Sequence, residues 1–310
     1  SIDDTIGRVI ERLEDDATVI VMSDHGFGPL HHTVNVNMFL LDQGLLKLRS
    51  GAWTRIKAGL FRAGITPASI WHLIERAGLQ NYVWQVSKST RNKVVSKFLS
   101  FDDVDWSRTV AYSIGHVGQV YINLRGREPR GIVDPGAEYE AVRQQVTDAL
   151  QELRHPQTGE PMVDEILPGD EVVSGPYASR SADLHLVLDG YRAIAFPLFA
   201  ADRCIVTRQI RGDSGSHRRH GILIAWGDGI RPGKTVPRAH IMDLTPTILH
   251  LMGLPVPDDM DGHVLSSVLA INRPVEYQRT EVLEAATEEG LSAEEAAEVE
   301  ERLRSLGYLG

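Results

Sequence analysis

The feature that most constrains the fold is the stretch VIVMSDHGFGP at residues 19–29. Its first four residues are all apolar, and because they do not alternate with polar ones they predict a strand covered on both faces. Asp24 and His25 follow where this strand ends, and ligands in open α/β sheets bind at the carboxyl ends of the strands. A plain turn fits as well, with Asp24 bonding backbone N–H groups and Gly26 taking a positive φ. The stretch therefore predicts an α/β sheet with an acid and a histidine at one strand end.

The composition narrows the class of protein. Among 310 residues, 42% are hydrophobic and 24% are charged, as in a folded protein. The formal net charge of −10 argues against binding of a nucleic-acid polymer, and an anionic substrate would need a local source of positive charge. Cys204 is the single cysteine, so neither an internal disulfide framework nor a zinc cluster built on several cysteines is possible. No run of about eighteen apolar residues exists, and no transmembrane segment is predicted.

The start of the chain carries its own expectations. The first residue is Ser1, and a helix and a strand begin almost at once. We therefore expect the chain to be the later part of a longer polypeptide, with further strands of the sheet upstream. No cleavable signal is recognised, and a cytoplasmic location is expected.

Helical and strand patterns alternate along the rest of the chain. Apolar residues recur at helical spacing over residues 136–153, and a short helix closed by glycine is predicted over residues 243–255. Strands are predicted at 118–124, 182–188 and 221–227. This alternation favours an α/β fold of three αβα layers, with a mainly parallel sheet and a helical insertion.

The insertion is the basic segment at residues 51–105. The charged residues between 51 and 100 are all Lys or Arg, with the single exception of Glu75. We interpret this segment as a solvated basic face on an inserted helical pair, and a lid or anion-steering surface is the functional alternative. Residues 1–50 and 106–270 would together form the core of the domain.

Residues 271–310 are predicted to be an acidic helical tail. Ser292 and Glu295 form a capping box, and apolar residues follow at helical spacing. We expect this helix to dock on the core or on a partner, so an oligomer formed through it is a candidate.

Three motifs in order point to one family. The S-D-H-G of residues 23–26 is followed by GSHRRHGILIAWG at 215–227 and DLTPTILHLMGLP at 243–255. Together they resemble the type I phosphodiesterase and nucleotide pyrophosphatase branch of the alkaline phosphatase superfamily, and the likeness extends through residues 106–133. The resemblance implies an alkaline-phosphatase-like fold and hydrolysis of phosphodiester, pyrophosphate or phosphomonoester bonds. The substrate would be a phosphate ester, with nucleotides among the candidates.

The resemblance also implies two divalent transition-metal ions. Asp24 and His25 match ligands of one ion and His217 matches a ligand of the other, with His220 as the competitor for His217. Carboxylate and imidazole donors suit Zn²⁺ first, and Mn²⁺ or Fe as alternatives. Asp243 is expected to hold backbone groups, and Asp183 to cap a strand end. The metal site requires Asp24, His25 and His217 to meet at one edge of the sheet.

The family's nucleophile is a Thr or Ser that forms a covalent phospho-enzyme, and in the family it lies upstream of S-D-H-G. No catalytic residue is therefore assigned in this chain, which is expected to be inactive alone. Two other functions stay open. One is a phosphotransferase like the cofactor-independent phosphoglycerate mutases, and the other is a non-catalytic binding or scaffold relative. Bound metal would argue against the scaffold.

Overall fold

The computed structural model describes residues 1–310 except for 15, 80–96, 197–198, 209–213, 237 and 281–310. The chain forms two units. The terminal unit comprises residues 1–26 and 219–310, and the central unit comprises residues 27–218. No helix among the described residues is both long enough and apolar enough to cross a membrane.

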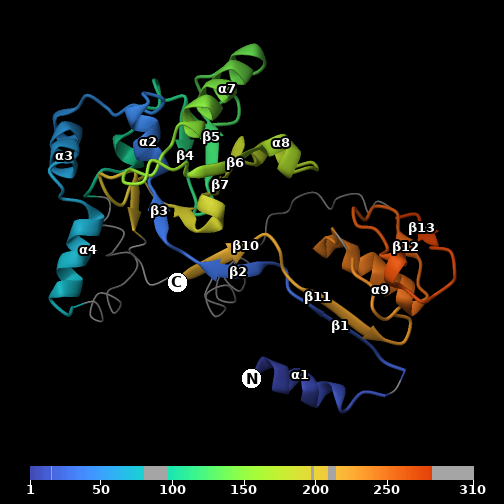
Figure 1. The fold of residues 1–310 in the computed structure, drawn as a ribbon. Coiled ribbons are helices and arrows are strands. Elements are labelled where there is room, and N and C mark those ends of the chain that lie inside the picture. The colour runs from blue at the N-terminus through green and yellow to red at the C-terminus, as the bar shows by residue number, and fades with distance from the viewer. Residues whose placement is uncertain (15, 80–96, 197–198, 209–213, 237, 281–310) are drawn as a thin grey trace, which may run out of the picture. The chain divides into compact units, whose positions relative to one another are not determined.

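The central unit contains small sheets in which most strands pair antiparallel (Figure 1). Its strands are β2 (Gly26–Pro29), β3 (His32–Val34), β4 (Ala111–Ser113), β5 (Gln119–Ile122), β6 (Val163–Pro168), β7 (Leu184–Leu188), β8 (Ala193–Ala195), β9 (Val206–Arg208) and β10 (Gly215–Arg218). The order β4-β5-β7-β6 forms an antiparallel sheet of four strands. In a second sheet, β3 lies between β8, which is parallel to it, and β9, which is antiparallel. Strands β2 and β10 pair separately.

Helices α2 (Val36–Asp42), α7 (Ala137–Gln151) and α8 (Gly169–Val172) pack against the sheet of four strands. The unit also contains α3 (Ala52–Arg62), α4 (Pro67–Arg76) and the 3-10 turns η1 (Phe101–Asp103), η2 (Ala178–Arg180) and η3 (Asp189–Tyr191). Helix α7 buries Val146 and Leu150 completely in the hydrophobic core. Helix α2 is held to β4 by Asn37, whose amide donates to the carbonyl of Ser113 and accepts from its N–H, both at 2.8 Å. The side chain thus supplies the bonds that a neighbouring strand would give this edge of the sheet.

A buried ion pair anchors α3 to η1. Lys57 Nζ lies 3.0 Å from Asp103 Oδ2, and both side chains are less than a tenth exposed. The hydroxyl of Thr54 donates to the other carboxylate oxygen. Because both charges are desolvated, this pair fixes the position of α3 through its geometry.

The terminal unit contains α1 (Ile2–Ile10), β1 (Thr18–Met22), β11 (Leu223–Gly227), η4 (Ile241–Asp243), α9 (Leu244–Met252), β12 (Val256–Pro257), η5 (Ser266–Val268) and β13 (Tyr277–Gln278). Strands β1 and β11 pair antiparallel over five residues each, and β12 pairs parallel with β13. The hydroxyl of Ser1 caps α1 by accepting from the N–H of Asp4. Helix α9 ends at Gly253, whose φ of +76° closes it as predicted.

The α/β class is confirmed, while the mainly parallel sheet is not. A parallel pair needs a crossover of about a dozen residues, whereas β4 and β5 are joined by a short turn that can only make an antiparallel pair. The prediction that residues 19–22 are covered on both faces is wrong for the described residues. Strand β1 is half-buried over Val19–Val21 and exposed at Met22, because β11 is its one described partner.

The three predicted domain boundaries stay predictions. Residues 51–105 lie within the central unit, and α3 and α4 form part of them. Their proposed role as a lid is not tested by the fold. The predicted helix with the Ser292–Glu295 capping box lies outside the described residues.

Candidate metal centre

Ser23 fixes the start of the S-D-H-G segment against β11. Its backbone N–H donates to the carbonyl of Ile222 at 3.0 Å, and its hydroxyl oxygen accepts from the N–H of Ile222 at 2.9 Å. Gly221 lies against the same segment, since a Cβ built there would be 2.5 Å from Ser23 Oγ and 2.7 Å from its carbonyl oxygen. Glycine is therefore required at 221 by close approach. Two motifs 199 positions apart form one local structure.

Asp24 and His25 lie side by side after β1. His25 Nε2 is 3.5 Å from Asp24 Oδ2, and the His25 backbone N–H donates to Asp24 Oδ1 at 3.1 Å. His25 Nδ1 is 2.8 Å from the carbonyl oxygen of Gly26. A carbonyl only accepts, so this bond requires the proton on Nδ1, and in the neutral ring the lone pair is then on Nε2, as in metal-binding histidines. The side chain of Asp24 is 70% exposed and that of His25 is 36% exposed.

The glycines of the motif act differently from the prediction. Gly26 does not take a positive φ, and neither does Gly28, because both belong to β2. A Cβ at Gly28 would lie 2.5 Å from Nε of Arg218. Glycine therefore lets an arginine of the neighbouring strand pass over the backbone. The hydrogen bond from His25 N–H to Asp24 does match the predicted turn.

His217 lies on β10 of the central unit, and its side chain is exposed. Its ring centroid is 6.5 Å from that of Phe27, and Nδ1 is 3.4 Å from the hydroxyl of Ser216. The adjacent Arg218 donates from its guanidinium to the carbonyls of Pro29 and Tyr191. These bonds tie β10 to β2 and to η3.

The predicted ligands fall in different units. Asp24, His25 and the exposed His220 belong to the terminal unit, while His217 belongs to the central unit. Among the described residues, no group of three or more His, Cys, Asp or Glu is arranged to hold a metal ion. The adjacent carboxylate and the Nε2 lone pair are nevertheless a donor set that Zn²⁺ accepts. The joint site with His217 stays a prediction.

Asp243 has the structural role that was predicted. Its carboxylate is buried and accepts from the backbone N–H groups of His240 and His263, each at 2.8 Å. Burial raises the pKa of Asp243, but these backbone hydrogen bonds outweigh it, and the net shift is downward. The residue therefore holds two loops beside α9.

Asp183 organises the central unit. It is buried next to β7 and accepts from the N–H of Ile122 at 2.6 Å, from Arg127 at 2.9 and 2.6 Å, and from the hydroxyl of Tyr139 at 2.6 Å. Burial opposes the charge of Arg127, but the bonds to Asp183 raise its pKa overall. The sequence had indicated a strand-end cap for Asp183. Its partner Arg127 was missed, since no local pattern links residues 56 positions apart.

The fold is mixed α/β with an Asp–His pair directly after one strand, and it fits the phosphoester hydrolases of the alkaline phosphatase superfamily. The family model for "Type I phosphodiesterase / nucleotide pyrophosphatase" matches residues 1–216. The chain therefore belongs to this family.

A curated relative shares a shorter stretch. A 2,3-bisphosphoglycerate-independent phosphoglycerate mutase from Laribacter hongkongensis (strain HLHK9) is 49% identical over 41 residues. The match covers 13% of this chain and 8% of the mutase. It shows a local similarity to that protein.

Proposed function

We propose that the protein to which this chain belongs hydrolyses phosphate esters with the help of two divalent transition-metal ions. The observation that carries the proposal is the Asp24–His25 pair, which follows β1 and in which Nδ1 of His25 bonds to the carbonyl oxygen of Gly26, in a chain of this family. Asp24 and His25 would hold one ion, and His217 the other, with His220 as the alternative. The substrate is a phosphodiester, a pyrophosphate or a phosphomonoester, and a nucleotide fits the family.

In this proposal, residues of this chain would hold the metal ions and fix the orientation of the metal-binding side chains. Gly26 keeps the His25 ring in place through its carbonyl oxygen, and Ser23 fixes the preceding backbone to β11. When bound, the two ions, Zn²⁺ first among the candidates, polarise phosphoryl oxygens and lower the pKa of the attacking hydroxyl. A Thr or Ser oxygen forms a bond to phosphorus while the ester oxygen leaves, and water then cleaves the phospho-enzyme. We propose that this Thr or Ser lies outside the 310 residues.

Metal analysis of the purified full-length protein tests the assignment. We expect two transition-metal ions per chain, one lost in Asp24→Ala and His25→Ala, and the other lost in His217→Ala. The variant His220→Ala should keep both ions. Unchanged metal content in the first three variants would refute the ligand assignment, and a metal-free protein would favour the scaffold.

The local match to a phosphoglycerate mutase supports phosphotransfer as the second candidate function. A phosphotransferase would pass the phosphoryl group to a second hydroxyl with little release of inorganic phosphate. Analysis of the products formed from phosphoglycerates therefore distinguishes a hydrolase from a phosphotransferase. Assay of the 310-residue chain alone on a chromogenic phosphodiester tests the upstream nucleophile, since turnover by this chain would contradict it. The cytoplasmic location and an oligomer formed through the tail are likewise proposals.

A further inference from the structure

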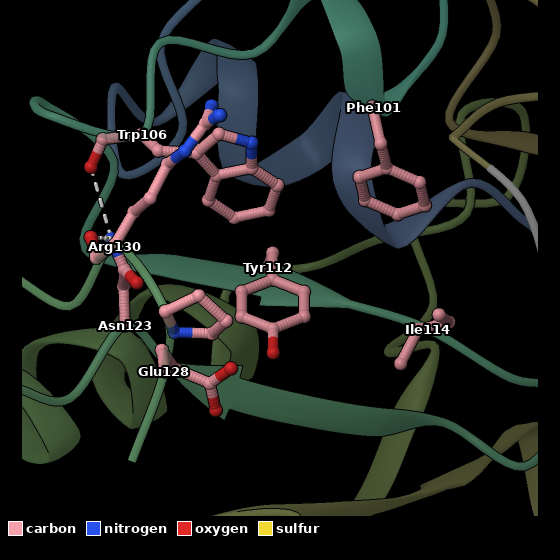
Figure 2. A pocket seen from close by; sticks show the side chains of 8 residues that line it. Phe101, Trp106, Tyr112, Ile114, Asn123, Glu128 and Arg130 are labelled. Carbon is pink, nitrogen blue, oxygen red and sulfur yellow. Dashed lines mark hydrogen bonds between the residues drawn. The ribbon is translucent and has the colours of Figure 1, made fainter. Parts of the chain in front are cut away.

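A pocket of about 420 Å³ opens in the central unit where three aromatic side chains meet (Figure 2). Phe101 comes from η1, Trp106 from the following loop and Tyr112 from β4. The rings of Phe101 and Trp106 are nearly parallel, at 16°, while that of Tyr112 stands at 82° and 89° to them. The volume suits a small molecule.

A carboxylate lines the same pocket. Glu128 is part of the lining, and its Oε1 accepts from Nε of Arg127 at 3.1 Å. Arg127 is already bonded twice to the buried Asp183. One guanidinium thus faces two carboxylates, so these three residues together carry a net negative charge, which Glu128 presents at the pocket.

Arg130 is the one positively charged residue of the pocket lining. It is exposed, and its side chain makes no ion pair or hydrogen bond with any residue that the structure describes. Figure 2 shows its guanidinium beside Trp106, away from Glu128. Arg130 can therefore turn into solvent, whereas Glu128 is held in place by Arg127.

The arrangement of the rings selects among ligand shapes. A flat ring inserted between Phe101 and Trp106 would need about 7 Å, two contacts of about 3.5 Å each, and their centroids are 6.3 Å apart. Perpendicular rings instead offer contact on more than one side to a compact, rounded group. Aromatic rings beside a carboxylate attract organic cations through the ring quadrupole and the charge.

We propose that this pocket binds an organic ammonium cation, such as a methylated amine, in the space that Trp106, Tyr112 and Phe101 line and against the carboxylate of Glu128. The site is separate from the residues proposed to hold metal and does not depend on the hydrolase proposal. Nothing in its recognition requires phosphate.

Calorimetric titration of the 310-residue chain tests the charge preference. The probes are choline and its uncharged isostere 3,3-dimethylbutan-1-ol, which have nearly the same shape. We expect choline to bind on the order of tenfold more tightly than the alcohol. Equal affinities, or no binding of choline, would overturn the proposal.

Three variants locate the site. Glu128→Gln keeps an acceptor for Arg127 but removes the charge, so choline affinity should fall to that of the alcohol. Trp106→Leu keeps an apolar wall but removes the aromatic ring. It should lower the affinity for choline and leave the affinity for the alcohol unchanged. Arg130→Ala is the matched control of opposite charge and should leave choline affinity equal or higher. Thermal unfolding checks that each variant folds. If Trp106→Leu does not fold, Glu128→Gln alone tests the proposal.

The control variant Arg130→Ala also distinguishes a cation site from a site for an anion or a neutral ring. If Arg130→Ala abolished binding while Glu128→Gln did not, the pocket would recognise an anion or a neutral ring through Arg130. That result would refute the cation site.

Discussion

The two units bury their apolar side chains to very different extents. In the central unit, one core cluster joins α2, the sheet strands and α7, and residues such as Leu40, Val120 and Leu150 are completely buried in it. In the described part of the terminal unit, the buried hydrophobic residues are Val256, Val268 and Leu269. Helix α1 buries none of its residues there.

The difference indicates that apolar packing contributes less to the stability of the described part of the terminal unit than to that of the central unit. The terminal unit, which carries Asp24 and His25, depends on hydrogen bonds such as those of Ser23 with Ile222 and of Asp243 with two loops. The central unit depends on packing and on buried charge pairs. Substitutions should therefore affect stability by different routes in the two units.

The largest effect is expected at Asp183. Asp183→Ala leaves Arg127 without its buried counter-charge and the N–H of Ile122 without an acceptor. We expect a loss of about 3–5 kcal/mol in unfolding free energy, measured by urea denaturation. The control is Asp170→Ala, which removes an acid that pairs with Arg143 at the surface and should cost roughly 0–1 kcal/mol. Similar losses in both variants would show that burial does not distinguish the two pairs.

Core packing gives the most direct comparison of the units. Leu150→Ala in α7 removes a fully buried side chain and should cost about 2–5 kcal/mol. Ile224→Ala in β11 removes a side chain that is 54% exposed and should change the free energy by less than roughly 0.5 kcal/mol. Denaturant unfolding of both variants measures the ratio. A large loss in Ile224→Ala would mean that another surface covers β11 in solution.

Close approach in the terminal unit predicts an intermediate effect. Gly221→Ala places a methyl group against Ser23 and should destabilise by about 1–3 kcal/mol. Gly7→Ala, where nothing lies within 4 Å of the added atom, should instead stabilise α1 by up to about 1 kcal/mol. Thermal unfolding compares the two. A neutral Gly221→Ala would show that the S-D-H segment yields at little cost.

The smallest expected effect is the pH dependence set by Asp243. Its folded pKa lies below the usual 3.8, so its contribution is fully present above that value and is lost as the pH falls through the folded pKa. Asp243→Asn should lower stability by roughly 1 kcal/mol at neutral pH and flatten the acid limb of the stability curve. Unfolding measured between about pH 2 and 7 tests this. An acid limb unchanged by the substitution would assign it to other carboxylates.

Local patterns predicted elements better than they predicted pairing. The helical spacing over 136–153 gave α7, and Gly253 gave the end of α9, because both signals lie within the element itself. The direction of strand pairing depends on the length of the connections, and the covering of β1 depends on which other elements pack there. Neither the pairing direction nor the covering of a strand can be predicted from the residues of that strand alone.

For the candidate site too, local features were predicted and long-range contacts were not. Asp24 and His25 were placed correctly at the end of β1 by the sequence, since the apolar run and its end are local. Their meeting with His217 is a long-range relation and remains a prediction. The aromatic pocket was not predicted, because Phe101, Trp106 and Tyr112 come from a 3-10 turn, a loop and a strand, and no local sequence pattern indicates that their rings line one cavity.

Arg218 has an electrostatic consequence that follows from its bonding. Its guanidinium donates to carbonyl oxygens, which are uncharged, and it meets no carboxylate among the described residues. A fixed, uncancelled cation therefore stands next to His217 in a chain whose formal charge is −10. Its field draws incoming anions toward β10 over about a Debye length, so their encounter rate should fall as ionic strength rises.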